Sequence, residues 1–117
     1  MTTHKDLKVW NEAVTLVTSI YQKTKSFPED ETFGLTSQIR RCSISIPSNI
    51  AEGAARSTNK DFSRFLHIAS GSAAELQTQL IISKNLNYIS EHTYEKIAAD
   101  TEAISKMLSG LIKSLNR

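Results

Sequence analysis

The sequence predicts an all-α fold, an antiparallel up-down-up-down four-helix bundle that takes up the whole chain, 1–117, as a single domain. Three observations lead to this prediction. Apolar residues recur at spacings of three and four, the helical period, in four successive segments. No segment alternates with period two over the length of a strand. The breaks between the segments are short, which favours antiparallel neighbours.

The predicted helices span about 6–26, 31–56, 59–87 and the segment from 91 onward. Asp6, Thr58 and Ser90 are the expected N-caps of the first, third and fourth helices, because short polar side chains accept bonds from free backbone N–H groups. The acidic cluster 29–31 stands where carboxylates favour the start of the second helix.

The second and third helices are predicted to be long. At roughly 26–29 residues and 1.5 Å per residue, each would measure about 40 Å. The third helix also carries apolar residues off its core line, at Ile68, Ile81, Ile82 and Leu86. These features leave apolar surface for another subunit.

Pro47 lies inside the second predicted helix and predicts a kink there, because proline cannot donate to the Ser43 carbonyl. A nearby serine hydroxyl or water is expected to satisfy that oxygen. A polar line runs beside the apolar one and comprises Gln38, Cys42, Ser45, Asn49, Glu52 and Arg56. Two interpretations of this line are open, a solvated face or a polar network buried at an interface.

The third helix contains the small-residue run 71–74, GSAA, which permits close approach of another backbone. We expect this run to meet the Pro47 segment, within one bundle or between subunits. Glu75 lies just beyond, and Arg41 is its expected partner. The residues assigned to assembly and structure are Ser45, Asn49, Glu52, Ser72 and Glu75.

The formal charge of the chain is +2, without the strong basic bias of a typical nucleic-acid binder. The segment 38–67 nevertheless holds a net +3. Its cations are Arg40, Arg41, Arg56, Lys60 and Arg64. Placed together at one end of the bundle, they are a candidate surface for phosphate contacts, which an oligomer would multiply; the alternative is that they only keep the protein soluble.

No arrangement in the sequence indicates catalysis. The Glu-x-x-His motif of di-metal bundles is absent and the histidines are dispersed, so neither a metal nor a cofactor is expected. Cys42, the one cysteine, excludes an internal disulfide and is expected to be inert core packing. With no apolar segment of signal-peptide type and no run long enough to span a bilayer, the sequence predicts a cytoplasmic, non-enzymatic protein without a membrane partner.

Three segments carry a resemblance to a known family: LKVWNEA at 7–13, FPEDETFGLTSQIRRCSISIPSNIAEGAAR at 27–56, and DFSRFLHIASGSAAELQTQLIIS at 61–83. They resemble the bacterial four-helix-bundle family of intervening-sequence proteins, which are encoded in insertions within large-subunit ribosomal RNA genes. The resemblance implies a homopentamer and kinship with the accessory protein of diversity-generating retroelements, a pentamer that binds nucleic acid and a reverse transcriptase. It supplies no catalytic residue.

Two functions follow as expectations. The first is a non-enzymatic oligomeric bundle that binds RNA or DNA, as an adaptor for a reverse-transcriptase-like or other nucleic-acid-processing partner. The alternative is a protein–protein interaction scaffold that has no affinity for nucleic acid.

Overall fold

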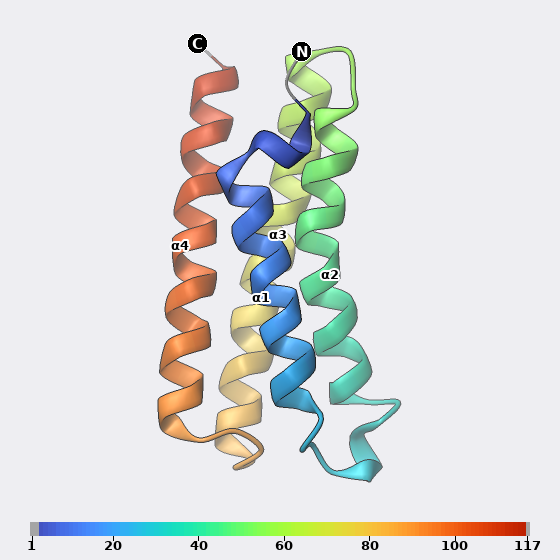
Figure 1. Cartoon of the computed structure of the whole chain (residues 1–117), viewed down its shortest axis with the longest axis vertical. Helices are drawn as coiled ribbons and strands as arrows, with labels where there is room; N and C mark the ends of the chain where they lie inside the picture. The colour runs from blue at the N-terminus through green and yellow to red at the C-terminus, as the bar shows by residue number, and fades with distance from the viewer. Residues whose placement is uncertain (1–2, 117) are drawn as a thin grey trace.

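The computed structural model describes residues 3–116, in which four α-helices lie side by side and alternate in direction (Figure 1). The helices are α1 (Lys8–Thr24), α2 (Leu35–Ala54), α3 (Asn59–Asn85) and α4 (Glu91–Leu115), with short 3₁₀ turns η1 (His4–Asp6) and η2 (Glu29–Glu31). Both α1 and α3 contact α2 and α4, while neither diagonal pair of helices is in contact within these residues. The predicted up-down-up-down bundle is therefore confirmed.

The core follows the predicted apolar lines. The fully buried apolar side chains of α3 are Leu66, Ala69, Ala73, Leu76 and Leu80. They pack with residues of the other three helices, including Leu16, Ile20, Ile39, Ile46, Ile50, Ile104 and Leu108. The apolar residues predicted to lie off the α3 core line are exposed. The outside of α3 is thus unusually apolar.

The start of α1 differs from the prediction. Asp6 does not cap α1; it belongs to η1, where its Oδ2 accepts from the Thr3 N–H at 3.0 Å. Leu7 takes the N-cap position of α1, without a side-chain cap bond. The reason is local competition: the Asp6 carboxylate folds back onto the residues before it, and the helix starts only after that turn.

The start of α2 is also later than predicted. The acidic cluster forms η2, and α2 begins at Leu35. Glu31 nevertheless caps α2 from outside, because its Oε1 accepts from the Leu35 N–H at 3.1 Å. With 20 residues, α2 is about 30 Å long rather than about 40 Å.

The caps predicted for α3 and α4 are confirmed. Thr58 Oγ1 accepts from the Asp61 N–H at 3.1 Å, and Ser90 Oγ accepts from the Thr93 N–H at 3.0 Å. Asn87 has a φ of 63°, the left-handed conformation that asparagine tolerates best among non-glycine residues. This turn reverses the chain between α3 and α4.

Pro47 is buried within α2, which continues through it from Leu35 to Ala54. The hydroxyls expected to satisfy the freed Ser43 carbonyl bond elsewhere: Ser43 Oγ donates to the Arg40 carbonyl at 2.9 Å, and Ser45 Oγ pairs with Ser72 Oγ. The kink at Pro47 stays a prediction.

Gly53 lets α2 and α3 approach closely near the loop that joins them. A Cβ atom on Gly53 would lie 2.8 Å from Phe65 Cβ and 2.9 Å from a ring carbon of Phe62. Both distances are shorter than normal carbon–carbon contacts. A side chain at this position would therefore force the helices apart.

We expect Gly53→Ala to lower the free energy of unfolding. Overpacking of this kind costs about 1–3 kcal/mol, which the better helix propensity of alanine offsets by only about 1 kcal/mol. The control is Gly110→Ala on α4, where a Cβ meets nothing within 4 Å, so that stability should rise by about 0.5–1 kcal/mol. Urea unfolding of both variants measures the difference, and equal effects would contradict this account of Gly53.

Candidate nucleic-acid and assembly surfaces

The polar line of α2 faces α3 within the same chain. Ser45 Oγ and Ser72 Oγ lie 2.8 Å apart, so the small-residue run of α3 does meet the Pro47 segment, as predicted. Asn49 Nδ2 donates to the Ser45 carbonyl at 2.8 Å and to its hydroxyl at 3.0 Å. Ser45, Asn49 and Ser72 are half-buried. These three residues therefore form a polar network at the α2–α3 contact. Their mutual hydrogen bonds agree with the interpretation as an interface network, and their partial exposure agrees with the interpretation as a solvated face.

Cys42 belongs to this contact. Its Sγ donates to the Ser72 carbonyl at 3.1 Å, and the side chain is buried. Burial raises the pKa of the thiol to about 12, and the nearby Glu75 carboxylate adds to the rise. At neutral pH the side chain is a protonated thiol rather than a nucleophilic thiolate, in line with its predicted inertness.

Cys42 should react slowly with a thiol-specific reagent in the native protein. A rise from 9.0 to about 12 lowers the thiolate fraction at neutral pH about a thousandfold. The measurement compares modification rates of native protein and of protein unfolded in guanidinium chloride. Similar rates in the two states would show that Cys42 is neither buried nor shifted.

A groove of about 540 Å³ lies between α2 and α3, next to this network on the side of the start of α2. Its lining includes Arg41, Cys42, Ser45 and Glu75. Phe33 also lines the groove, and 96% of its surface is accessible to solvent. Arg41 and Glu75 both line the groove, but no ion pair joins them within the described part of the chain. The pairing predicted for them is therefore not formed, although the two side chains do share one groove.

Arg40 connects α2 to α1 within the bundle, a structural role that the sequence alone did not indicate. Its Nε donates to Thr24 Oγ1 at 2.8 Å, and its guanidinium carbon lies 4.6 Å from the centre of the Tyr21 ring. Arg40 thereby ties α2 to the last turns of α1. Thr24 also donates to the Ile20 carbonyl at 2.8 Å, so this buried hydroxyl both donates and accepts a hydrogen bond.

Arg56, Lys60 and Arg64 lie around the loop between α2 and α3. The Phe65 ring holds two of them, with the Arg56 guanidinium 4.9 Å and the Arg64 guanidinium 4.5 Å from its centre. Lys60 is exposed in the first turn of α3. Arg56 pairs with Glu52 at 3.3 Å and Arg64 pairs loosely with Asp61 at 4.0 Å.

The five cations predicted to share one end of the bundle are divided between two places. Arg40 and Arg41 lie near the start of α2, and the other three lie past its end. Arg41 and Arg56 are 15 residues apart, about 22 Å along a helix axis. Only Arg56, Lys60 and Arg64, the loop cluster, form a joint cationic surface. The aromatic partner of this cluster, Phe65, lies at the three- and four-residue spacing of the α3 core line, so spacing alone does not reveal its contact with the two guanidinium groups.

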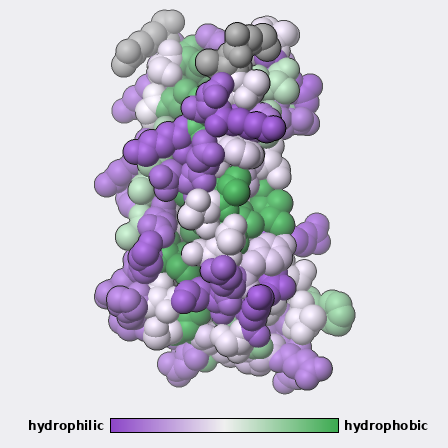
Figure 2. Space-filling model, in the orientation of Figure 1, coloured by the Kyte–Doolittle hydropathy of each residue, from purple (hydrophilic) through white to green (hydrophobic). Residues whose placement is uncertain are grey.

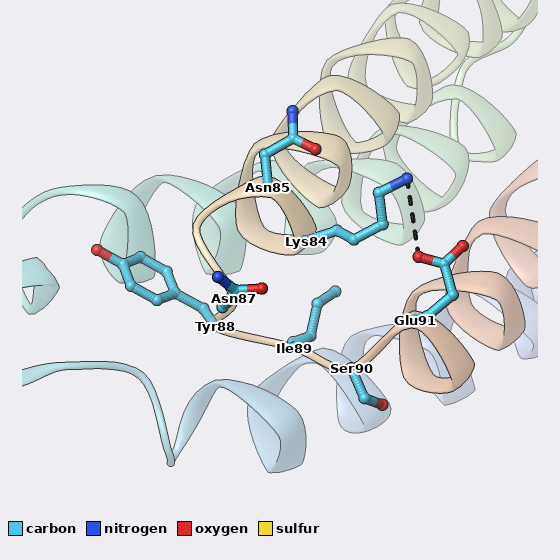
Figure 3. A pocket seen from close by; sticks show the side chains of 7 residues that line it. All are labelled: Lys84, Asn85, Asn87, Tyr88, Ile89, Ser90 and Glu91. Atoms are coloured by element: carbon cyan, nitrogen blue, oxygen red, sulfur yellow. Dashed lines mark ion pairs between the residues drawn. The ribbon is translucent and has the colours of Figure 1, made fainter.

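The turn between α3 and α4 forms a shallow hollow of about 580 Å³, drawn in Figure 3. Lys84 and Glu91 face each other across it at 3.9 Å. Tyr88 points away from this pair, and its hydroxyl donates to Glu31 Oε2 at 2.9 Å. Because Glu31 also caps α2, a single carboxylate links the α3–α4 turn to the start of α2.

The hydrogen bond to Glu31 raises the pKa of Tyr88 above its usual value of 10.0. The bond therefore stabilises the fold fully below pH 10 and is lost as the pH rises through the raised pKa of Tyr88. We expect wild-type protein to lose stability relative to Tyr88→Phe in that alkaline window. Urea unfolding at a series of pH values measures this, and a constant difference between the two proteins would contradict it.

Between Thr3 and Asn116, no group of three or more His, Cys, Asp or Glu side chains is placed to hold a metal ion. In the same part of the chain, the helices lack the length and apolar character required to cross a membrane.

Comparison with known proteins places this bundle in a family. Residues 5–110 match the family model described as 23S rRNA-intervening sequence protein. A crystal structure of a protein of unknown function from the S23 ribosomal protein family of Bacteroides thetaiotaomicron is similar, with a TM-score of 0.84 and 30% sequence identity. The similarity covers 90% of this chain and 98% of that one. A search of curated proteins found no match. Because the family model covers most of the chain, the protein belongs to the 23S rRNA-intervening sequence protein family.

Proposed function

We propose that this protein is a non-enzymatic bundle that assembles with copies of itself and binds RNA or DNA through the loop cluster. It would act as an adaptor for a nucleic-acid-processing partner, such as a reverse-transcriptase-like protein. The observation that carries the proposal is the placement of Arg56, Lys60 and Arg64 around one exposed loop, with two guanidinium groups against Phe65.

The chemistry of the loop cluster suits phosphate. Guanidinium groups present several donors in a planar fork that matches phosphate oxygens. The carboxylates that now pair with Arg56 and Arg64 are at the surface, where ion pairs are worth little and exchange readily for other anions. The N–H groups at the start of α3 lie at the same loop and favour anions.

A non-enzymatic role has separate support. The two side chains with displaced pKa values, Cys42 and Tyr88, both have structural partners. Cys42 lines the groove beside Glu75, but its raised pKa keeps it a protonated thiol, which is a poor nucleophile. The family description refers to 23S rRNA, and the similar crystal structure is of a protein of unknown function.

Self-assembly is the second part of the proposal, and the family resemblance implies a homopentamer. Exposed apolar side chains on α3 and on the α1–α2 side support an association between copies. An oligomer would repeat the loop cluster several times, and avidity would raise a modest affinity per chain.

The same apolar residues favour a second candidate function, a protein-interaction scaffold without nucleic-acid affinity. Phe33, 96% exposed, is the strongest single observation for it, because a large aromatic side chain in water usually marks a contact. The two functions differ in one measurable property, binding to nucleic acid.

Replacement of the loop cluster by Arg56→Gln, Lys60→Gln and Arg64→Gln should weaken binding to labelled single-stranded RNA and duplex DNA. If each cation contacts one phosphate, the slope of log affinity against log salt on duplex DNA should fall by about 3 units. Fluorescence anisotropy from low to moderate salt measures both quantities.

The matched control is Lys23→Gln, Lys25→Gln and Lys96→Gln, which removes three exposed charges away from the loop cluster. Control protein should bind with nearly unchanged affinity. Wild-type protein that gives no anisotropy change at low salt would exclude the nucleic-acid proposal and favour the scaffold.

A further inference from the structure

The groove between α2 and α3 presents two opposite charges across from each other. Arg41 on α2 and Glu75 on α3 both line it, and neither forms an ion pair among residues 3–116. The contact between Ser45 and Ser72 sets a common level on the two helices. From that level, Arg41 lies about 6 Å and Glu75 about 4.5 Å toward the start of α2, at 1.5 Å per residue. A strong donor therefore stands on one wall and a strong acceptor on the other, at nearly the same height.

The carboxylate of Glu75 is held by a buried amide. Gln79, one turn further along α3, has 5% of its surface exposed, and its Nε2 donates to Glu75 Oε2 at 3.4 Å. The carboxylate also helps to raise the pKa of the Cys42 thiol, which agrees with its place beside a residue of the groove lining. A carboxylate accepts at about four lone-pair sites, so Glu75 keeps acceptor capacity for a ligand.

Phe33 lines the groove from the loop that precedes α2, and 96% of its surface is exposed. Figure 2 shows a hydrophobic group at the lower right edge of the molecule, where this loop projects from the bundle, with hydrophilic surface near it. An exposed aromatic ring beside a polar groove is suited to stack on a flat ring of a ligand.

The rest of the lining is neutral. Besides Cys42, it consists of hydroxyl and amide groups, which belong to Ser37, Gln38, Ser45 and Ser72. The formal charges of Arg41 and Glu75 cancel, so the groove favours a neutral group with donors on one edge and acceptors on another. Its volume of about 540 Å³ lies within the range of about 300–1,000 Å³ of small-molecule sites.

Among the nucleobases, guanine has this arrangement of edges. Its N1–H and N2–H groups are adjacent donors for a carboxylate, and its O6 and N7 are adjacent acceptors for a guanidinium fork. Adenine places an amino group where guanine has O6 and an acceptor where guanine has N1–H, so it opposes both contacts. Cytosine and uracil carry their polar groups on one edge, so opposite walls cannot hold them in the same way.

We propose that the groove binds an unpaired guanine base of a single-stranded nucleic acid. Glu75 accepts from N1–H and N2–H, Arg41 donates to O6 and N7, and Phe33 stacks on the neighbouring base. The inference rests on the nucleic-acid part of the proposed function and adds base recognition to it. The loop cluster holds phosphates of any sequence, while the groove reads one base.

One strand is able to contact both places. The groove and the loop cluster lie on the same pair of helices, with Arg41 and Arg56 about 22 Å apart along the axis. A stacked strand covers that distance with about 6–7 nucleotides, at about 3.4 Å per nucleotide.

The test measures fluorescence anisotropy with oligouridines of about 12 nucleotides, which exceed this distance. One central base is guanine, adenine or uracil. Wild-type protein should prefer the guanine oligonucleotide by about 5- to 150-fold, the value of a good base-edge contact. A ribose series and a deoxyribose series distinguish RNA from DNA as the source of the base, and the preference should appear in the series that binds more tightly.

Two modified bases assign the contacts to residues. Inosine lacks the N2 amino group and 7-deazaguanine lacks N7, so wild-type protein should bind each less tightly than guanine. Glu75→Ala should bind the guanine and inosine oligonucleotides equally, and Arg41→Ala should bind the guanine and 7-deazaguanine oligonucleotides equally. A general loss of structure does not produce this pairing of one atom with one residue. Phe33→Ala should weaken all oligonucleotides by a similar factor, because stacking tolerates every base.

The matched controls are Lys23→Ala on α1 and Glu95→Ala on α4, which each remove one exposed charge outside the groove. Both should keep the guanine preference. Equal affinity of wild-type protein for guanine and adenine oligonucleotides would overturn the inference and leave the proposed function standing. So would an unchanged preference in both Arg41→Ala and Glu75→Ala.

The loop-cluster variant separates the two proposals. It should weaken every oligonucleotide and keep the ratio between guanine and adenine, because it changes phosphate contacts alone. A retained ratio with undiminished affinity would overturn the loop cluster and support the groove. Absence of binding to every oligonucleotide at low salt would overturn both.

Discussion

The close contact between α2 and α3 determines where the other parts of the molecule lie. Gly53 permits it at one end by offering no side chain to Phe62 and Phe65. Ser45 and Ser72 hold it in the middle through a hydroxyl pair that fixes the register of the two helices. Neither contact tolerates a large change of spacing, because the first is steric and the second is a directional hydrogen bond. The loop cluster and the groove at Arg41 both take their geometry from this pair of helices.

The α2–α3 contact also uses several polar groups of α2 and α3 in hydrogen bonds within the chain. Ser45, Asn49 and Ser72 are satisfied by one another within the chain, so they contribute structure rather than recognition. The charged groups to which the proposed functions assign recognition lie at the edges of the α2–α3 pair. The guanidinium groups of Arg56 and Arg64 lie at one end, held by an aromatic ring, and Glu75 lies on the flank. A rigid pair of helices that presents adaptable charges at its margins is well suited to a partner that is itself polyanionic or self-complementary.

Periodicity predicted the helices and the core well, because burial of an apolar stripe is a local property of the sequence. It predicted helix starts less well. Asp6 and the cluster 29–31 have the composition of helix N-termini, yet each bonds to a neighbouring turn before the helix begins. That choice depends on local backbone geometry, which spacing does not record.

The candidate surfaces were predictable only in part, for a different reason. Arg40 and Arg56 look alike in sequence, because both are arginines beside an apolar line. Their environments differ through residues far along the chain, Thr24 for the one and Phe65 for the other. The meeting of the Pro47 and Gly71 segments could be predicted because small residues permit close packing. The predicted ion pair of Arg41 with Glu75 is not formed among the described residues, because ion pairing across two helices depends on side-chain directions that residue spacing does not record.

The pairing of helices in the bundle has a consequence for the folding rate of the chain. Among the four α-helices of residues 3–116, contacts join α1 to α2, α2 to α3 and α3 to α4, which are neighbours in sequence, while α1 against α4 joins helices that are distant in sequence. Such a topology has a low contact order, so little loop entropy is lost before the first packing energy is gained. The α2–α3 hairpin, with a four-residue connection and a contact specified at two levels, needs no other helix to define its register. Helical proteins of this kind fold in microseconds to milliseconds, and closure of α1 onto α4 is the one step that must wait for the rest of the chain.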